Sequence, residues 1–216
     1  MNTNEKFVIT ISREIGSGGR TVGRKLARKL GVRFCDKELI NALREKFSLS
    51  ASEIERIKGE KKNWLADMIR STIPSPEFVL LNDPNSAYLN TVRVPVTTDE
   101  IFEAETEILK ELAAESSCVI AGRSGFFVLK DVPNKVDIML VAPRDKRIAR
   151  VAEKQNLTPD KAALIVDSVD KSRENYVKRY TGNSRYDLRN YDLVLNVDDL
   201  SEDEVVDIIL AYLKAL

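Results

Sequence analysis

A glycine-rich stretch near the start of the chain carries the residue types best suited to bind phosphate. Residues 12–21 read Ser-Arg-Glu-Ile-Gly-Ser-Gly-Gly-Arg-Thr and follow a short apolar segment. Glycines at such a turn let backbone N–H groups approach an anion, and the start of the next helix adds partial positive charge. The alternative is a glycine-rich turn that binds no ligand. The candidate phosphate-binding residues are Gly16, Ser17, Gly18, Gly19, Arg20 and Thr21.

This stretch departs from the phosphate-loop motif G-x-x-x-x-G-K-[ST]. If Gly19 is the second glycine of the motif, the first glycine position holds Glu14; a one-residue shift places Gly19 where the lysine belongs. Neither register contains the lysine. Arg20 is the candidate to supply its charge, as a planar fork instead of a point charge. The hydroxyl of Thr21, or that of Ser17, is the candidate Mg²⁺ ligand.

A second candidate region is the cationic stretch 171–189, which has six basic and two acidic side chains and a net charge of +4. Arginines that close over phosphates stabilise the charge spread over the transferred oxygens, an effect of about 10³-fold or more in rate. Arg173 and Arg179 are therefore candidate catalytic residues, and Arg185 is a candidate substrate-binding residue. A solvated helix face is the alternative for this stretch.

Two further side chains stand at the ends of predicted strands. Arg123, in Ala121-Gly122-Arg123, is a candidate to hold a substrate phosphate in a bidentate manner, or else an ordinary turn arginine in a surface ion pair. Asp36 is favoured as a helix N-cap, and the alternative is binding of a substrate hydroxyl or of a water bound to magnesium. Both roles of Asp36 are compatible.

The elements that position these residues are short apolar strands separated by helical segments. Alternation of strands and helices predicts a parallel sheet covered on both faces, with the ligand crevice beyond the carboxyl ends of the strands. The glycine loop, Asp36 and Arg123 all follow such ends. The predicted strands are Phe7–Ile11, Val32–Cys35, Cys118–Ala121, Val136–Ala142 and Leu193–Val197.

Helix signals occur between the strands. Val22, Leu26 and Leu30 share one face of a helix that ends at Gly31. Further helices are predicted after Asp36, at the capping boxes Ser50/Glu53, Thr97/Glu100 and Ser201/Glu204, and over Lys146–Gln155 and Asp160–Tyr180. The last helix is expected to bury Val205, Ile208, Ile209, Tyr212 and Leu213.

Composition narrows the function classes. The 216 residues are 43% hydrophobic and 31% charged, which suits one α/β domain over 1–216. A formal net charge of zero gives no overall attraction to nucleic acid or to an anionic membrane, so neither is an expected partner. The absence of histidine excludes histidine-based catalysis and metal binding. The pattern carries no prediction of oligomeric state.

The cysteines and the start of the chain indicate a compartment. Cys35 and Cys118 are expected to be two buried thiols in a reducing cytosol, with a lone disulfide as the alternative. Residues 1–12 do not have the form of a signal peptide, and no stretch approaches the length of a membrane span. We therefore expect a cytoplasmic protein.

Several segments together resemble the cytidylate kinase-like family, a divergent branch of the P-loop nucleoside monophosphate kinases. The opening is Ile-Thr-Ile-Ser-Arg-Glu-Ile-Gly-Ser-Gly-Gly-Arg at 9–20, and the lid-like segment is Asp-Lys-Ser-Arg-Glu-Asn-Tyr-Val-Lys-Arg-Tyr-Thr-Gly at 170–182. The supporting segments are 34–40, 119–125 and 191–196. The chain lacks the family's usual loop lysine, and it has Ser124 where an aspartate usually follows Gly-Arg.

The resemblance implies a three-layer P-loop NTPase fold with a five-stranded parallel sheet, a helical NMP-binding insertion at about 48–95 and a lid at about 170–190. It implies ATP as donor, Mg²⁺ as cofactor and a small-molecule nucleotide acceptor, CMP or dCMP. Residues Gly16 to Thr21 would bind the donor phosphates, Asp36 and Arg123 would face the acceptor, and Arg173 and Arg179 would be the lid arginines. The alternatives are a non-catalytic nucleotide-binding regulator and a kinase with a non-nucleotide acceptor.

Overall fold

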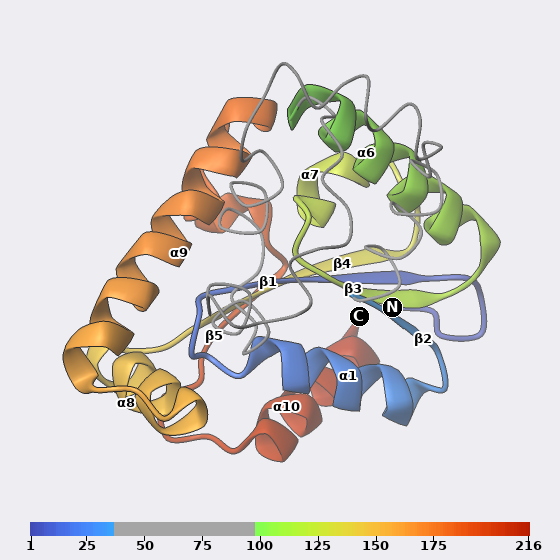
Figure 1. The fold of residues 1–216 in the computed structure, drawn as a ribbon. Coiled ribbons are helices and arrows are strands. Elements are labelled where there is room, and N and C mark those ends of the chain that lie inside the picture. Colours follow the sequence, from blue (N-terminus) through green and yellow to red (C-terminus); the bar gives the residue numbers. More distant parts are fainter. Residues whose placement is uncertain (37–97) are drawn as a thin grey trace, which may run out of the picture.

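The computed structural model describes residues 1–36 and 98–216 (Figure 1). Several sequence predictions fall outside these residues: the helix after Asp36, the capping box Ser50/Glu53, the insertion 48–95 and the cap at Thr97. They remain predictions.

Within residues 1–36 and 98–216, five strands form one parallel sheet, as expected from the alternating pattern. Their order across the sheet is β2-β3-β1-β4-β5. Because all strands run the same way, their carboxyl ends meet at one edge. The strands are β1 (Val8–Arg13), β2 (Arg33–Cys35), β3 (Cys118–Ala121), β4 (Lys135–Val141) and β5 (Leu193–Asn196).

The first strand is longer than the apolar run that predicted it. Ser12 and Arg13 continue β1 and pair with Met139 and Leu140 of β4, so the glycine loop begins only at Glu14. The apolar pattern could not reveal this extension because the paired residues are polar. It puts the Arg13 side chain on a rigid element instead of a loop.

Helices cover both faces of the sheet (Figure 1). α1 and α10 lie on one face and α6 and α7 on the other, while α8 and α9 pack together beside the carboxyl end of β1. The helices are α1 (Gly19–Leu30), α6 (Thr98–Glu115), α7 (Gly125–Val128), α8 (Arg144–Gln155), α9 (Pro159–Thr181) and α10 (Glu202–Ala215), with a 3₁₀ turn η2 (Leu188–Asn190). The short α7 was not predicted.

Of the three apolar clusters in the described residues, two hold the helices against the sheet, and the third joins α8 and α9 to the loop after β1. One lies between the sheet and α1 and α10; the other lies between the sheet and α6 and α7. Val22 and Leu26 are fully buried in the first core, and Gly31 ends α1 in the left-handed conformation with φ of 67°, both as predicted. Cys35 and Cys118 are buried, free thiols of the second core.

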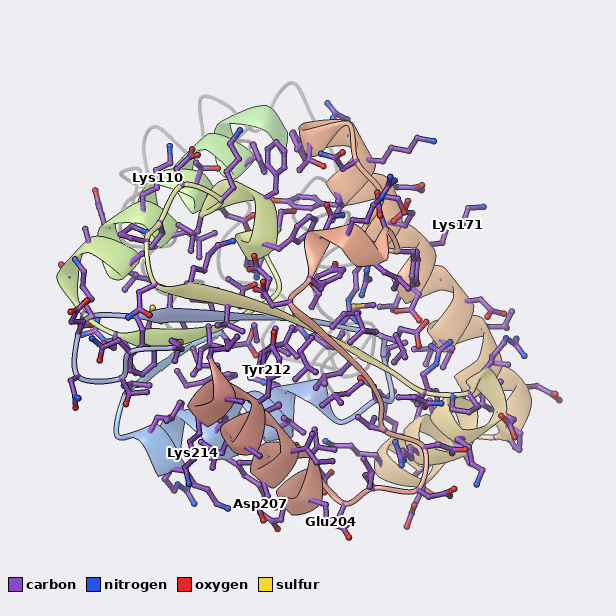
Figure 2. The ribbon with its side chains drawn as sticks, turned by 180° about the vertical axis from the view of Figure 1, so that it is seen from behind. Lys110, Lys171, Glu204, Asp207, Tyr212 and Lys214 are labelled. Atoms are coloured by element: carbon purple, nitrogen blue, oxygen red, sulfur yellow. The ribbon has the colours of Figure 1, made fainter. Side chains whose placement is uncertain are left out.

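The last helix begins at the predicted capping box of Ser201 and Glu204. One prediction for it was wrong: Ile208 is 37% exposed, and Val206 is buried in its place. The buried stripe is displaced because α10 faces both the sheet and α1. Figure 2 shows Tyr212 on the sheet side of this helix, where its hydroxyl donates to the Asp192 carbonyl oxygen at 2.9 Å.

Among the described helices, none is long and apolar enough to cross a membrane.

Candidate active site

The glycine loop lies at the carboxyl end of β1 and is fixed by α8 and α9. The Ile15 N–H donates to Asp170 Oδ1 at 3.1 Å, and the Ile15 carbonyl oxygen accepts from Arg147 Nη1 at 3.3 Å. Glu14 Oε2 accepts from the Ala142 N–H at 3.1 Å. These bonds hold the loop conformation independently of any ligand, as a preorganised binding loop requires.

The start of α1 has the features of an anion site. Gly16 and Gly18 are left-handed, with φ of 82° and 75°. Gly18 caps the helix without a side-chain hydrogen bond, and the first turn has no acidic residue. The first N–H groups of α1 are therefore available to an external acceptor, in the field of the helix dipole.

We expect Gly16→Ala to destabilise the protein more than an alanine at an open left-handed position. A Cβ at Gly16 would lie 2.7 Å from the Arg147 carbonyl oxygen, whereas one at Gly182, with φ of 70°, would meet no described residue within 4 Å. Gly182→Ala should therefore cost only the left-handed strain, roughly 1–2 kcal/mol. Gly16→Ala should cost about 2 kcal/mol more through overpacking. Urea unfolding of the two variants measures the difference, and equal losses would show that the loop tolerates a side chain at Gly16.

Four arginine side chains line a small cavity of about 40 Å³ beside the loop. They come from the end of β1, the turn after β3, the middle of α9 and the segment before η2. The described residues that line the cavity include no carboxylate. The arginines are Arg13, Arg123, Arg173 and Arg185.

Two of these arginines, Arg173 and Arg185, donate hydrogen bonds to the backbone of Arg13. Arg173 Nη1 donates to the Arg13 carbonyl oxygen at 2.9 Å, and Arg185 Nη2 donates to the same oxygen. Arg185 is 3% exposed, yet its Nη1 has no hydrogen-bond partner among the described residues and lies 3.9 Å from Asp170 Oδ1. A buried guanidinium with an unused donor is costly unless an acceptor binds.

The electrostatics of this cluster disfavour its own charge. The pKa of Arg13 is lowered to about 10, chiefly by burial. The nearby Asp36 raises this pKa, and the positive charges of Arg185, Arg123 and Arg20 lower it further. Burial, followed by the charges of Arg13 and Arg185, also lowers the pKa of Arg173 well below its ordinary value. A bound anion would relieve both effects, so the cavity is suited to a phosphate.

Arg123 is held by a buried acid. Its Nη1 pairs with Glu105 Oε1, and the other oxygen of Glu105 accepts from the Tyr176 hydroxyl. Burial and the charge of Glu105 raise the pKa of Tyr176 above its ordinary value. Both side chains of the Arg123–Glu105 ion pair are buried, so it is not the surface ion pair that the sequence offered as the alternative for Arg123.

The turn that carries Arg123 is strained. Arg123 and the following Ser124 both have positive φ, of 62° and 53°. Non-glycine residues in this region cost about 1–3 kcal/mol each, and such residues are concentrated at functional sites. The strain directs the Arg123 side chain into the cavity, as its candidate role in substrate binding requires.

Arg20 and Asp36 form an ion pair, with Arg20 Nε 2.7 Å from Asp36 Oδ2. Asp36 is buried and Arg20 is about one-third exposed. Both candidates therefore lie at the same edge of the sheet, but the charge of Arg20 is already paired. From the sequence, Arg20 was expected at the donor phosphates and Asp36 at the acceptor, and no contact between them was predicted.

The remaining candidates have mixed surroundings. Thr21 lies half-buried in the first turn of α1, while the Ser17 hydroxyl donates to the Glu14 carbonyl oxygen at 2.9 Å. Arg179 is exposed on α9, with its guanidinium carbon 5.4 Å from the centre of the Tyr180 ring. The described lining of the cavity includes Arg173 and Arg185 but not Arg179.

Sequence reasoning missed four residues that build this site. Arg13 was read only as a loop residue, and Asp170 only as part of the lid segment. Asp170 pairs with Arg147 at 2.5 Å and joins the loop to α9. A signal was present for Asp170, since Arg173 follows three residues later on the same helix face. Glu105 and Tyr176 carried no local signal, because Glu105 pairs with Arg123, 18 residues along the chain, and Tyr176 donates to Glu105, 71 residues away.

The described residues include no group of three or more potential metal ligands. Mg²⁺ prefers oxygen ligands and keeps several waters, with substrate phosphates completing its shell. Thr21 fits such a site because it stands in the first turn of α1. The Ser17 hydroxyl donates to the Glu14 carbonyl oxygen and keeps its lone pairs for a cation, so it stays the alternative ligand.

Comparison with known proteins agrees with this geometry. The sequence model described as the cytidylate kinase-like family matches residues 8–199. A cytidylate kinase of Sulfurisphaera tokodaii is 26% identical over 212 residues, covering 96% of both chains. One of Pyrococcus horikoshii is 25% identical and covers 98% of this chain and 91% of its own.

Solved structures share the fold. An uncharacterized protein from Eubacterium ventriosum has a TM-score of 0.69 at 23% identity, covering 98% of this chain and all of its own. A shikimate kinase from Bacteroides thetaiotaomicron has a TM-score of 0.52 at 17% identity, covering 97% of this chain and 99% of its own. These structures establish the three-layer P-loop kinase fold expected from the sequence.

Proposed function

We propose that this chain, which belongs to the cytidylate kinase-like family, transfers the γ-phosphoryl group of ATP to a nucleoside monophosphate. CMP and dCMP are the first acceptors to consider. The observation that carries the proposal is the cavity lined by four arginines beside a glycine loop. Phosphoryl transfer needs little covalent catalysis, and its rate depends on positioning and on charge neutralisation.

The glycine loop and the start of α1 are suited to bind a nucleoside triphosphate. The backbone of Gly16 to Thr21 would hold the donor phosphates, because the loop is preformed and α1 is uncapped. The hydroxyl of Thr21 would be a ligand of Mg²⁺, which supplies charge neutralisation when bound. These residues therefore support ATP and Mg²⁺ as donor and cofactor.

The acceptor side is supported by Arg123 and Arg185, which reach the cavity from different elements. The Glu105 ion pair fixes Arg123, and Nη1 of Arg185, which makes no hydrogen bond to the described residues, is a ready donor to a phosphate oxygen. Asp36, at the end of β2, would face the nucleotide while paired with Arg20. The insertion 48–95 would complete this side.

The segment 170–190 would act as the lid. Its arginines at 173 and 185 contact the Arg13 carbonyl oxygen at the end of β1, so the segment already reaches the loop. Exclusion of water by such a lid would suppress hydrolysis of ATP. Arg179, exposed on the same segment, would join the site on closure.

One observation favours a different function. Arg20, the nearest cation to the start of α1 in the sequence, is paired with Asp36. A loop whose positive charge is consumed in this way is compatible with a regulator that binds nucleotide without turnover.

An acceptor panel tests these functions. ATP and Mg²⁺ would be incubated with CMP, dCMP, UMP, AMP, GMP and shikimate, and products identified by mass. We expect CDP or dCDP. Binding of ATP with no product from any acceptor would favour the regulator, and a phosphorylated hydroxyl compound would identify a non-nucleotide acceptor.

A further inference from the structure

The Arg13 side chain occupies the space where a side chain at position 19 would begin. A Cβ added at Gly19 would lie 2.6 Å from the Cβ of Arg13 and 2.9 Å from its Cγ. Interiors are close-packed and do not tolerate such overlap. The stem of Arg13 and any side chain at position 19 therefore exclude each other.

The sequence motif gives this exclusion a meaning. In G-x-x-x-x-G-K, the first glycine stands six residues before the lysine. When Gly19 is placed at the lysine position, the first glycine position holds Arg13. Compared with the motif, this chain has a cation, Arg13, at the glycine position and a glycine, Gly19, at the lysine position. The Arg13 side chain still starts beside the place where the lysine side chain of the motif would start.

The head of Arg13 points toward the cavity. A Cβ added at Gly122, just after β3, would lie 2.1 Å from Arg13 Nη1. The guanidinium thus lies between the carboxyl ends of β1 and β3, next to the glycine loop. The buried Arg185, whose Nη1 has no hydrogen bond within the part of the chain that the structure describes, lines the same cavity.

We propose that Arg13 replaces the missing loop lysine and binds the phosphate groups of the donor nucleotide. The assignment of the donor as ATP rests on the proposed function, but the chemistry recognised is that of a polyphosphate anion. Arg20, paired with Asp36, does not take this role.

The electrostatics of Arg13 agree with a binding role over a structural one. Its lowered pKa, caused chiefly by burial and also by the other arginines, means that folding disfavours its charge. An anion bound beside Arg13 would offset the burial and the repulsion.

The first test moves the cation back. We would measure the affinity of the protein for inorganic tripolyphosphate by titration calorimetry in Arg13→Gly, in Gly19→Lys and in the double variant R13G/G19K. Arg13→Gly should lose affinity by at least about tenfold, through loss of charge-assisted hydrogen bonds. Gly19→Lys alone should lower the unfolding midpoint, because the new stem overlaps that of Arg13.

The double variant should recover affinity to within about threefold of the unmodified chain, which makes the two positions strongly non-additive. A folded double variant that binds no better than Arg13→Gly would overturn the inference. Arg24→Ala, which removes an exposed arginine of α1, is the charge control and should leave the affinity unchanged.

Arg13→Met keeps the stem and removes only the charge, so it tests the role even if glycine at this position prevents folding. We expect it to lose tripolyphosphate affinity by at least about tenfold, while the unfolding midpoint without ligand does not fall. A lower midpoint with unchanged affinity would assign Arg13 a structural role. Loss of affinity in Arg20→Ala but not in Arg13→Met would assign the lysine's role to Arg20.

These measurements are independent of turnover. An inactive chain that binds tripolyphosphate through Arg13 would refute the proposed function and leave this inference intact. An active chain whose affinity is unchanged in Arg13→Met would refute the inference alone.

Discussion

Asp170→Ala should lower the free energy of unfolding by about 3–5 kcal/mol and abolish nucleotide turnover. Asp170 is buried and pairs with Arg147 at 2.5 Å, and it also accepts from the Ile15 N–H of the glycine loop. Removing the carboxylate takes away the nearer of two acids that pair with the buried Arg147, leaving Glu14 Oε2 at 3.4 Å from its Nε, and it releases the loop. Urea unfolding measures the first effect, and product formation measures the second.

Asp167 offers a matched control on the same helix. It pairs with Arg144 at 2.6 Å, but both side chains are more than half exposed. Exposed pairs contribute little, so Asp167→Ala should leave the unfolding midpoint nearly unchanged. Equal shifts for the two variants would mean that Asp170 is no more than an ordinary helix residue and that the loop is held by other contacts.

Arg173→Ala should reduce turnover by about 10³-fold while changing the affinity for ATP much less. Its side chain, 13% exposed, lines the cavity and contacts the end of β1, where transferred charge would be neutralised. The effect should therefore appear in kcat and not in binding. Single-turnover kinetics and calorimetric titration of ATP separate the two quantities.

Two other cations of α9 provide the comparison. Figure 2 shows Lys171 pointing away from the body of the protein, and Lys171→Ala should leave kcat unchanged. Arg179→Ala should lower kcat less than Arg173→Ala, because Arg179 is exposed in this structure. A loss of kcat in Arg179→Ala as large as that in Arg173→Ala would favour the ranking drawn from the sequence, in which both are equal lid arginines.

Much of the fold was predictable because it depends on local patterns. The strand Cys118–Ala121, the capping box at Ser201 and the helix end at Gly31 were all confirmed. These features follow from runs of apolar residues, from capping pairs and from a left-handed glycine. The error at Ile208 arose where α10 packs on two neighbours, which a single periodicity does not describe.

The site was predictable only in part. The glycine loop and the arginine-rich segment were recognised from composition, and the structure brings Arg123, Arg173 and Arg185 to one cavity. The partners of these arginines were missed. Glu105 and Asp170 become part of the site only through tertiary packing. Arg13 was missed because the motif has its cation directly after the second glycine, which indicated position 20.

Under the proposed function, this chain moves the γ-phosphoryl group of ATP onto an acceptor phosphate. The most direct measurement follows the γ-phosphoryl oxygens themselves, with ATP labelled by ¹⁸O at the three non-bridging γ positions. With CMP and Mg²⁺, the labelled phosphoryl group should appear in CDP, and the acceptor oxygen should come from CMP. Label recovered only in inorganic phosphate, or retained in ATP with every nucleoside monophosphate tested, would contradict the claim.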